Sequence, residues 1–419
     1  MKYTLINCYS DNNKGDSGII LSTVELLKEF DSNADIVGVS TYNFSDNFFH
    51  TEHEFLKSKI SVLPSIFGEL NIGSKKGIIH KNIRFFYDSI RLFVFLAFPK
   101  SWKKIKTLIF SKEENETIKR LELSDYVISK GGSFICNEND IREKIALVRF
   151  IYIFILAFKL DCKVVILCQS IGPVYGKLSI KIINYLIAKC EIVVLREKVC
   201  IDEYPYLNLK ASNVVVTNDI AFYLDTKNVA PNLIPIDNEA VNVGFTIKGV
   251  SKKSSKAYLT MMVDGIKHCV DKYGAIVHIF PHVTIDNDVE VSYQVHKMLD
   301  DKYKSKVFLY NEDYNAPELK SIYSSMNYFV GTRLHSTIFA MGEFVPSICI
   351  SYHGTKSAGI FANYGLERYS LTEYSSENLI QKLDDLVINK DEIVSIIKQK
   401  HIFFKNEHLN LFKRIFRRL

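Results

Sequence analysis

The sequence is poor in three features that would place a protein in a specialised class: paired cysteines, long apolar runs and charge of one sign. Its eight cysteines are scattered, with no Cys-x-x-Cys pair and no Cys/His cluster of zinc spacing, so neither a disulfide framework nor a structural metal is expected. The apolar stretch 150–158 is shorter than the roughly 20 residues that cross a bilayer. The first ten residues lack the charged-then-apolar pattern of a secretory signal, which predicts a cytoplasmic protein.

Charge and composition exclude little else. The 53 basic and 47 acidic residues leave a net charge of +6, which is too small for this length to indicate nucleic acid as a partner. No internal repeat or low-complexity tract is found. With 419 residues, of which 47% are hydrophobic, the chain exceeds one ordinary domain of roughly 100 to 200 residues, and two domains are expected.

Short apolar, β-branched runs alternate with helical patterns along the chain. Such alternation predicts parallel sheets covered by helices, so the expected fold class is α/β with two Rossmann-like domains. The periodicity lapses where Pro231, Pro235 and three asparagines gather. We therefore expect an N-terminal domain over 1–228, a linker over 229–240, and a C-terminal domain with C-terminal helices over 241–419, with a central cleft at the carboxyl ends of the two sheets. Strands are expected at 3–8, 36–39, 126–128, 164–168, 192–195, 214–216, 241–247, 275–280, 307–309, 328–330 and 347–351.

The segment 328–344 holds the pair of residues best suited to an anion. A strand runs into Arg333 and His335 and then into a helical pattern, and a helix start offers free N–H groups and the positive end of its dipole to a phosphate or carboxylate. The Arg333 guanidinium can hold such an oxyanion through two hydrogen bonds. His335 reaches the same anion if the backbone there is still extended, and imidazole is a natural proton donor near neutral pH. The alternative is that Arg333 forms an interdomain salt bridge and His335 caps the helix or packs.

Two other strand ends in the second half carry polar side chains, and each set of side chains either binds a ligand or has an ordinary structural role. Tyr352 and Lys356 follow the next strand, and Lys356 either adds a positive charge to the pocket or is a solvated surface lysine. His282 follows an earlier strand and leads into the acidic segment 286–288, which either binds the acceptor or only caps the helix expected at 289–299.

Glycine turns follow two strands of the first half. Gly15 and Asp16 lie in a polar turn, but Gly15 with Gly18 is not a full dinucleotide fingerprint, so a nicotinamide cofactor is not indicated. Gly131 and Gly132 allow a ligand to approach the backbone closely. Each turn alone is weak support for a binding site.

Polar residues end two further strands of this half. Gln169 and Ser170 close one strand, and Arg196 follows the next. Arg196 is a candidate second anion clamp facing the cleft, whereas an Arg beside a Glu, here Glu197, is often only a surface ion pair.

Taken together, these segments resemble the polysaccharide pyruvyl transferase family over most of the chain. The run 331–336, followed by Pro346 and 352–359, is the specific part. One departure is Ser133, which stands where a third glycine is usual after Gly131 and Gly132. The other matching pieces are Gly15 with Asp16, Gly131 with Gly132, 169–173, 195–197, 219–222, and 281–282.

The resemblance implies a GT-B-like fold with an acceptor side in the first domain and a donor side in the second. It implies phosphoenolpyruvate as donor, a sugar of a cell-surface polysaccharide precursor (exopolysaccharide, capsule or lipopolysaccharide) as acceptor, a cyclic pyruvate ketal as product, and no metal or resident cofactor. Arg333 and His335 match the family's donor-site residues, and Arg196 is a looser match. The expected catalytic residue is His335. The expected substrate-binding residues are Arg333, Arg196, Lys356, Gly15, Asp16, Gly131, Gly132, Gln169, Ser170, His282 and Tyr352.

Two stretches mix basic and aromatic residues in a way that suits an anionic bilayer surface. They span 81–112 and 408–419, and a lipid-linked saccharide acceptor on the inner face of the cell membrane would explain both. The alternative is that their apolar residues are buried and their basic residues solvated.

Two other functions stay open at this stage. One is a nucleotide-sugar glycosyltransferase of the same fold, although the two glutamates eight residues apart that often mark retaining members do not follow Arg333. The other is a non-catalytic saccharide-binding or assembly protein that keeps the cleft.

Overall fold

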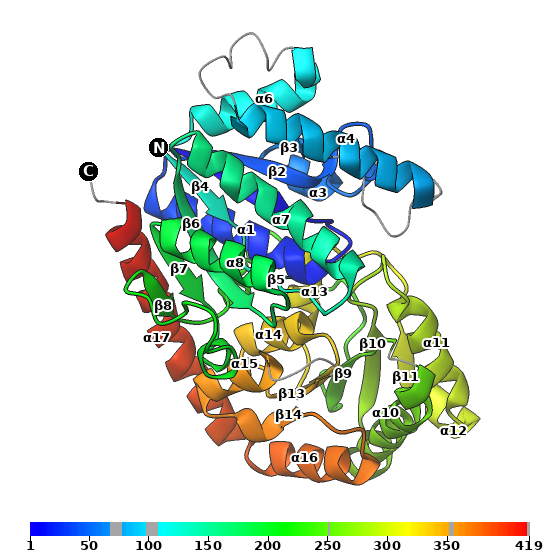
Figure 1. Cartoon of the computed structure of the whole chain (residues 1–419). Coiled ribbons are helices and arrows are strands. Elements are labelled where there is room, and N and C mark those ends of the chain that lie inside the picture. The colour runs from blue at the N-terminus through cyan, green and yellow to red at the C-terminus, as the bar shows by residue number, and fades with distance from the viewer. Residues whose placement is uncertain (68–77, 98–107, 250–251, 352–355, 417–419) are drawn as a thin grey trace. The chain divides into compact units, whose positions relative to one another are not determined.

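The chain forms two compact units, each built on its own sheet (Figure 1). The computed structural model describes residues 1–67, 78–97, 108–249, 252–351 and 356–416. Unit 1 comprises Met1–Asp11, Thr23–Thr217 and Leu411–Leu419, and unit 2 comprises Asn12–Ser22 and Asn218–Asn410. Helix α1 (Lys14–Phe30) therefore begins in unit 2 and ends in unit 1.

The sheet of unit 1 is parallel throughout, with the strand order β3-β2-β1-β4-β6-β7-β8 and with β5 paired to β6. Its long strands are buried along almost their whole length, as parallel strands covered on both faces must be. The strands are β1 (Lys2–Cys8), β2 (Asp35–Asn43), β3 (Ser61–Ser65), β4 (Tyr126–Ser129), β5 (Gly132–Ile135), β6 (Lys163–Ile171), β7 (Ile192–Leu195) and β8 (Val214–Val216).

Helices connect these strands and supply the rest of the core of unit 1. Helix α7 packs on β5 and β6, and its Phe154 and Leu156 are fully buried. Helix α6 begins with a capping box, because the Ser111 hydroxyl accepts from Glu114 N while the Glu114 carboxylate accepts from Ser111 N. The helices are α2 (Asn47–Thr51), α3 (Glu54–Lys57), α4 (Ile78–Ala97), α6 (Lys112–Glu122), α7 (Ile141–Lys159), α8 (Lys177–Lys189) and α9 (Val199–Glu203).

Unit 2 has a second parallel sheet, in the order β11-β10-β9-β12-β13-β14. The chain runs outward from β9 to β11 and then returns to lay β12 on the other side of β9, so the direction of the connections reverses between these two strands. The strands are β9 (Asn242–Thr246), β10 (Ile276–Phe280), β11 (Val307–Leu309), β12 (Tyr328–Gly331), β13 (Ser347–Ile350) and β14 (Ser370–Leu371).

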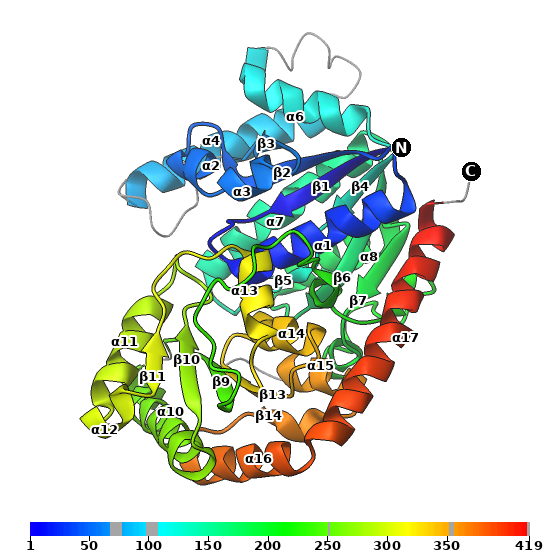
Figure 2. The same cartoon turned by 180° about the vertical axis from the view of Figure 1, so that it is seen from behind.

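The helices of unit 2 pack on this sheet and on one another, as the view from behind also shows (Figure 2). Helix α14 packs on β12 and β13, and α10 packs on β10 and α16. The helices are η2 (Ile220–Tyr223), α10 (Lys252–Tyr273), α11 (Asp288–Met298), α12 (Asp301–Lys304), α13 (Ala316–Tyr323), α14 (Leu334–Gly342), α15 (Lys356–Tyr364), η3 (Glu367–Tyr369), α16 (Ser376–Ile388) and α17 (Lys390–Phe416).

The end of α17 corrects one expectation from the sequence. Phe412 and Phe416 are buried, and the Phe416 ring lies 5.4 Å from that of Tyr3 and 4.9 Å from that of Tyr126. The apolar side chains of 411–416 are therefore buried core residues of unit 1 and are not available to a membrane. Within the described residues, no helix is both long and apolar enough to span a bilayer.

Candidate active site

Side chains of unit 2 gather where the strand order reverses, at the carboxyl ends of β9, β10 and β12. This edge is where open α/β sheets bind ligands. Lys248 follows β9, His282 follows β10, and Arg333 and His335 follow β12. The backbone ties two of these ends together, because Thr332 N donates to Thr246 O over 3.1 Å.

Arg333 is the N-cap residue of α14, with an extended backbone (φ −88°, ψ 117°). Its guanidinium is buried and bound by two carboxylates. Nε donates to Asp288 Oδ2 over 3.0 Å and Nη2 to Asp288 Oδ1 over 2.6 Å, which makes a bidentate pair. Nη2 also donates to Asp286 Oδ2 over 2.6 Å. The two carboxylates thus occupy the oxyanion-binding edge that the sequence predicts for a donor.

The two aspartates differ in exposure, and this difference bears on ligand binding. The Asp288 side chain is fully buried, whereas that of Asp286 is 47% exposed. Burial raises the pKa of Asp288, while the hydrogen bond and charge of Arg333 oppose that shift. Asp288 also accepts from Val283 N over 3.0 Å, and α11 begins with no side-chain capping bond from Asn287. Asp288 therefore positions Arg333, while Asp286 can leave it.

Lys248 is a second cation in this cluster that the sequence reasoning missed. Burial, followed by the charge of Arg333, lowers the pKa of Lys248 to about 8, while the two aspartates act in the opposite direction. Its backbone N–H donates to the Tyr258 hydroxyl over 3.1 Å, and the same hydroxyl is 2.7 Å from Thr332 Oγ1. A lysine with this pKa carries its positive charge only up to weakly basic pH.

His335 lies in the first turn of α14, so its backbone is helical and not extended as the prediction of anion contact assumed. Its Nε2 lies 3.7 Å from Oδ2 of the fully buried Asp219, a distance that stabilises the ring when it is protonated. Asp219 is fixed in turn, because its Oδ1 accepts from Ala221 N over 2.9 Å.

Gly15 packs directly against the His335 ring. A Cβ added at Gly15 would lie 2.5 Å from His335 Cγ and 2.7 Å from its Cβ, so only glycine fits beside the imidazole in this position. The polar turn that the sequence predicts here is partly the first turn of α1, where Asp16 accepts from Asn13 Nδ2 over 2.7 Å. The segment reaches the site by pairing with the loop after β10, since Thr284 N donates to Asn12 O.

His282 is buried against the same cluster. Its Nδ1 lies 3.3 Å from the Tyr323 hydroxyl, and its Nε2 has no hydrogen-bond partner within the described part of the chain. Burial lowers the pKa of His282 well below its usual value, and the positive charges of His335, Arg333 and Lys14 add to the shift. His282 is thus a neutral imidazole with a spare nitrogen.

Lys14 completes the set of cations near these histidines. It is buried, and its Nζ donates to the exposed Asp313 over 2.7 Å. Lys14 follows the first strand, in the turn that also holds Gly15. The sequence did not predict that Lys14 lies near the histidines, because this depends on the pairing of its segment with the loop after β10. Lys356 begins α15 and is partly buried, and Tyr352 lies outside the described residues.

The predicted residues of unit 1 are largely internal to that unit. Arg196 is buried, its Nε donates to Ser170 Oγ over 2.7 Å, and it lies 3.3 Å from the Glu197 carboxylate. The pair with Glu197 is therefore buried and is not a surface ion pair. Gln169 Nε2 donates to Ser170 O over 3.1 Å. Binding of a donor or acceptor by these residues stays a prediction.

The backbone structure by itself explains why glycine stands at positions 131 and 132. A Cβ at Gly131 would lie 2.7 Å from Cys168 O, because the backbone there runs against β6. Gly132 has a φ of 120° and begins β5, a strand that the sequence reasoning took for a turn. Close approach of a ligand to this backbone stays a prediction.

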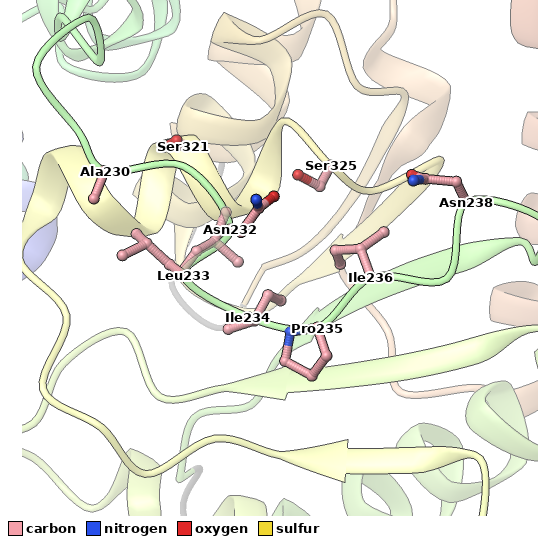
Figure 3. Close-up of a pocket in the computed structure, with 10 residues that line it drawn as sticks. Ala230, Asn232, Leu233, Ile234, Pro235, Ile236, Asn238, Ser321 and Ser325 are labelled. Carbon is pink, nitrogen blue, oxygen red and sulfur yellow. The ribbon is translucent and has the colours of Figure 1, made fainter.

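One pocket of unit 2 is lined by residues that precede β9 and β12 in the chain (Figure 3). Its walls come from the irregular segment 230–238, where the interdomain linker was expected, and from 321–325 at and beyond the end of α13. No titratable side chain is among the lining residues, which are Ala230, Asn232, Leu233, Ile234, Pro235, Ile236, Asn238, Ser321, Ile322 and Ser325. We assign it no chemical role.

Solved structures similar to this chain share its fold. A glycosyltransferase from Rickettsia africae is 12% identical with a TM-score of 0.55, covering 100% of this chain and 99% of its own. The Anabaena protein Alr3699/HepE, in complex with UDP and glucose, is 12% identical with a TM-score of 0.55, covering 97% and 95%. A UDP-GlcNAc 2-epimerase from Neisseria meningitidis is 10% identical with a TM-score of 0.52, covering 95% and 94%. The fold is α/β with two parallel sheets, as in these GT-B-like proteins.

Sequence comparison gives the family. Amylovoran biosynthesis protein AmsJ of Erwinia amylovora is 23% identical over 413 residues, covering 94% of both chains. The sequence model of the family described as "Polysaccharide pyruvyl transferase" matches residues 13–354 of the chain. The matched range includes the carboxyl ends of β9, β10 and β12, with Arg333 and His335. The chain belongs to the polysaccharide pyruvyl transferase family.

Proposed function

We propose that this protein transfers the pyruvyl group of phosphoenolpyruvate to two hydroxyls of a sugar in a cell-surface polysaccharide precursor, forming a cyclic ketal. The family supports a transferase of this type. The observation that carries the proposal is the group of Lys14, Lys248, Arg333 and His335 around the start of α14. A donor with a phosphate and a carboxylate suits several cations and a helix N-terminus.

Donor binding exchanges one anion for another at Arg333. The donor displaces the half-exposed Asp286 from Nη2, while Asp288 stays paired with Nε and keeps the guanidinium plane fixed. Lys248 offers a further positive charge. His282, neutral and with its Nε2 unpaired within the described residues, accepts or donates a hydrogen bond to the donor.

His335 acts as the general acid. Its imidazolium, stabilised by Asp219, donates a proton to the methylene carbon C3. The π electron pair of the C2=C3 double bond forms the new C3–H bond, which leaves a C2–C3 single bond and cationic character at C2. A sugar hydroxyl oxygen then bonds to C2, and its proton returns to the neutral His335. A second hydroxyl displaces phosphate from C2 and its proton leaves with that phosphate, so phosphoenolpyruvate and a diol become a ketal and inorganic phosphate. Because the donor is a cytoplasmic metabolite, the reaction is placed in the cytoplasm.

The test is release of inorganic phosphate from phosphoenolpyruvate in the presence of glycosides with free neighbouring hydroxyls. His335→Ala should lower turnover roughly 10²- to 10⁴-fold with little change in the dissociation constant of the donor. Leu178→Ala, an exposed substitution on α8 of unit 1, is the control and should leave both unchanged. Turnover that persists in His335→Ala sinks the assignment of the acid, and turnover of a nucleotide sugar with no response to phosphoenolpyruvate sinks the proposed reaction.

A further inference from the structure

Helix α4 of unit 1 carries a stripe of large apolar side chains on its exposed face. Phe86 is 69% exposed and Phe93 is 72% exposed, and the others in the stripe are Ile83, Tyr87 and Ile90. Successive members stand one or three residues apart, so they lie on one side of an α-helix over about 15 Å of its length. Isolated exposed apolar residues are common, but a contiguous stripe of this kind marks an interaction surface.

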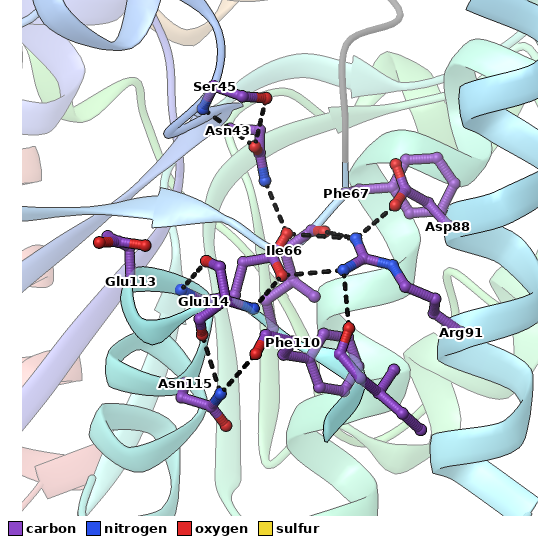
Figure 4. Close-up of polar contacts among 12 residues, drawn as sticks. Asn43, Ser45, Ile66, Phe67, Asp88, Arg91, Phe110, Glu113, Glu114 and Asn115 are labelled. Carbon is purple, nitrogen blue, oxygen red and sulfur yellow. Dashed lines mark hydrogen bonds and ion pairs between the residues drawn. The ribbon is translucent and has the colours of Figure 1, made fainter. Parts of the chain in front are cut away.

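The opposite face of α4 is held by buried charges (Figure 4). Arg91 Nη1 donates to Glu114 Oε2 over 2.9 Å and to Ile109 O over 3.2 Å. Arg91 Nη2 donates to Asp88 and to Glu114 Oε1, and Asn43 Nδ2 also donates to that Glu114 oxygen.

This network fixes the orientation of the helix. Rolling α4 to bury its stripe would expose the apolar residues Leu92 and Phe95, whose ring lies 4.9 Å from that of Phe110, and would separate Arg91 from its carboxylates. Separating the partners of a buried ion pair is strongly destabilising, because each charge is left buried without compensation. The stripe is therefore built to face outward.

The charge of the sequence around α4 indicates which kind of surface covers the apolar stripe. The sequence between residues 71 and 112 contains ten Lys and Arg residues and a single acidic residue, Asp88. Two of the ten, Arg84 and Arg91, are paired with the carboxylates of Asp88 and Glu114, which leaves eight basic residues in the segment. Apolar residues on a helix within a segment of positive charge suit the interface of an anionic bilayer. The placement of 71–77 and 98–107 lies outside the described residues, and the apolar contact proposed here rests on α4 alone.

Area also favours a lipid surface over a second copy of the chain. Five side chains of this size and exposure offer roughly 600 Å². A stable protein interface needs about 800 Å² from each partner.

We propose that the exposed face of α4 inserts into the interfacial region of an anionic membrane and anchors unit 1 there. Aromatic residues such as Phe86, Tyr87 and Phe93 are favoured at that depth, and the basic residues of the segment attract acidic headgroups. The proposal does not rest on pyruvyl transfer, although it would bring the enzyme to a lipid-linked saccharide.

The experiment is co-sedimentation of the full chain with vesicles of phosphatidylcholine alone and of phosphatidylcholine with 30 mol% phosphatidylglycerol, a composition of the order used to mimic anionic leaflets. The protein should bind the anionic vesicles and lose binding as salt is raised. Phe86→Ser/Phe93→Ser should weaken binding about 10²-fold, roughly tenfold for each ring.

Two matched variants keep the outcome decisive. Leu178→Ser/Ile402→Ser removes two apolar side chains that are 71% and 63% exposed elsewhere, and it should bind like the unchanged protein. Phe86→Leu/Phe93→Leu keeps apolar area on α4 and should retain most of the binding, which excludes misfolding as the cause of a loss.

Three outcomes overturn the proposal. They are no binding to anionic vesicles, equal loss in the control variant, and a dimer in analytical ultracentrifugation that the α4 serines abolish without vesicle binding. A failure of phosphoenolpyruvate turnover alone would leave vesicle binding as predicted, so the two proposals fail separately.

Discussion

Replacing Gly15 by alanine should damage catalysis much more than folding. The added Cβ would lie 2.5 Å from His335 Cγ, whereas ordinary van der Waals contact begins near 3.4 Å, so the imidazole must move by about 1 Å. The ring can move, because the His335 side chain is 20% exposed. It then leaves its position 3.7 Å from the Asp219 carboxylate, which weakens the stabilisation of the protonated form.

The size of this effect follows from how steeply a reaction depends on placement. A displacement of about 1 Å of a reacting group can cost about 10²-fold in rate. We expect Gly15→Ala to lower turnover of phosphoenolpyruvate by 10- to 100-fold. The midpoint of thermal unfolding should change by only a few degrees, since a partly exposed side chain absorbs the clash.

The assay is phosphate release at saturating donor, with the dissociation constant of phosphoenolpyruvate measured alongside. Gly274→Ala is the control for the substitution itself, because nothing lies within 4 Å of its added Cβ, although its φ of 63° gives it a modest strain. If Gly15→Ala turns over at the original rate, the position of His335 is not what sets the rate and the argument is refuted.

Four further outcomes are expected. Arg333→Lys keeps the charge but loses the planar fork, so calorimetry should show weaker donor binding, and unchanged binding would contradict a clamp at Arg333. Asp286→Asn removes a competing carboxylate at about half exposure, so the donor should bind roughly 2- to 5-fold more tightly, whereas weaker binding would mean that Asp286 supports the site. The pKa of Lys248 is lowered to about 8 in the folded protein, so the folded form loses this proton at a lower pH than the unfolded form does. Donor affinity should therefore fall as the pH rises through 8, whereas the free energy of unfolding should rise between pH 8 and 10.5. Both trends should vanish in Lys248→Met. Arg91→Met leaves the buried Glu114 without its cation, so denaturant unfolding should show a loss of about 3 to 5 kcal/mol, and a loss below about 1 kcal/mol would argue against a structural role for the network.

The sequence predicts the strands well because each is a short apolar run that ends in a polar residue. Strand β7 falls at its predicted residues, and β6 and β10 match to within a few residues. Three strands escaped prediction for physical reasons. Strand β3, at the edge of its sheet, contains Pro64, and a proline weakens the sequence pattern of a strand. Strand β5 opens with Gly132 and Ser133, which read as a turn, and β14 has only two residues.

The sequence nominates candidate site residues, but it does not predict the contacts that their side chains make. Arg333, His335 and His282 follow predicted strands, and the topology brings them to one edge of the sheet of unit 2. The bidentate bond from Arg333 to Asp288 joins residues 45 apart in sequence, and no local pattern distinguishes that aspartate from a helix cap. The sequence also led us to expect two contiguous domains. In the structure, residues 12–22 belong to unit 2 and the end of α17 belongs to unit 1. Both segments carry buried apolar side chains.

The central claim is that unit 2 binds phosphoenolpyruvate through Arg333. The most direct measurement is calorimetric titration of the purified protein with phosphoenolpyruvate and with a panel of nucleotide sugars, repeated on Arg333→Ala. We predict saturable binding of phosphoenolpyruvate that is lost in the variant. Binding of a nucleotide sugar alone, or phosphoenolpyruvate binding that Arg333→Ala leaves intact, would contradict the account.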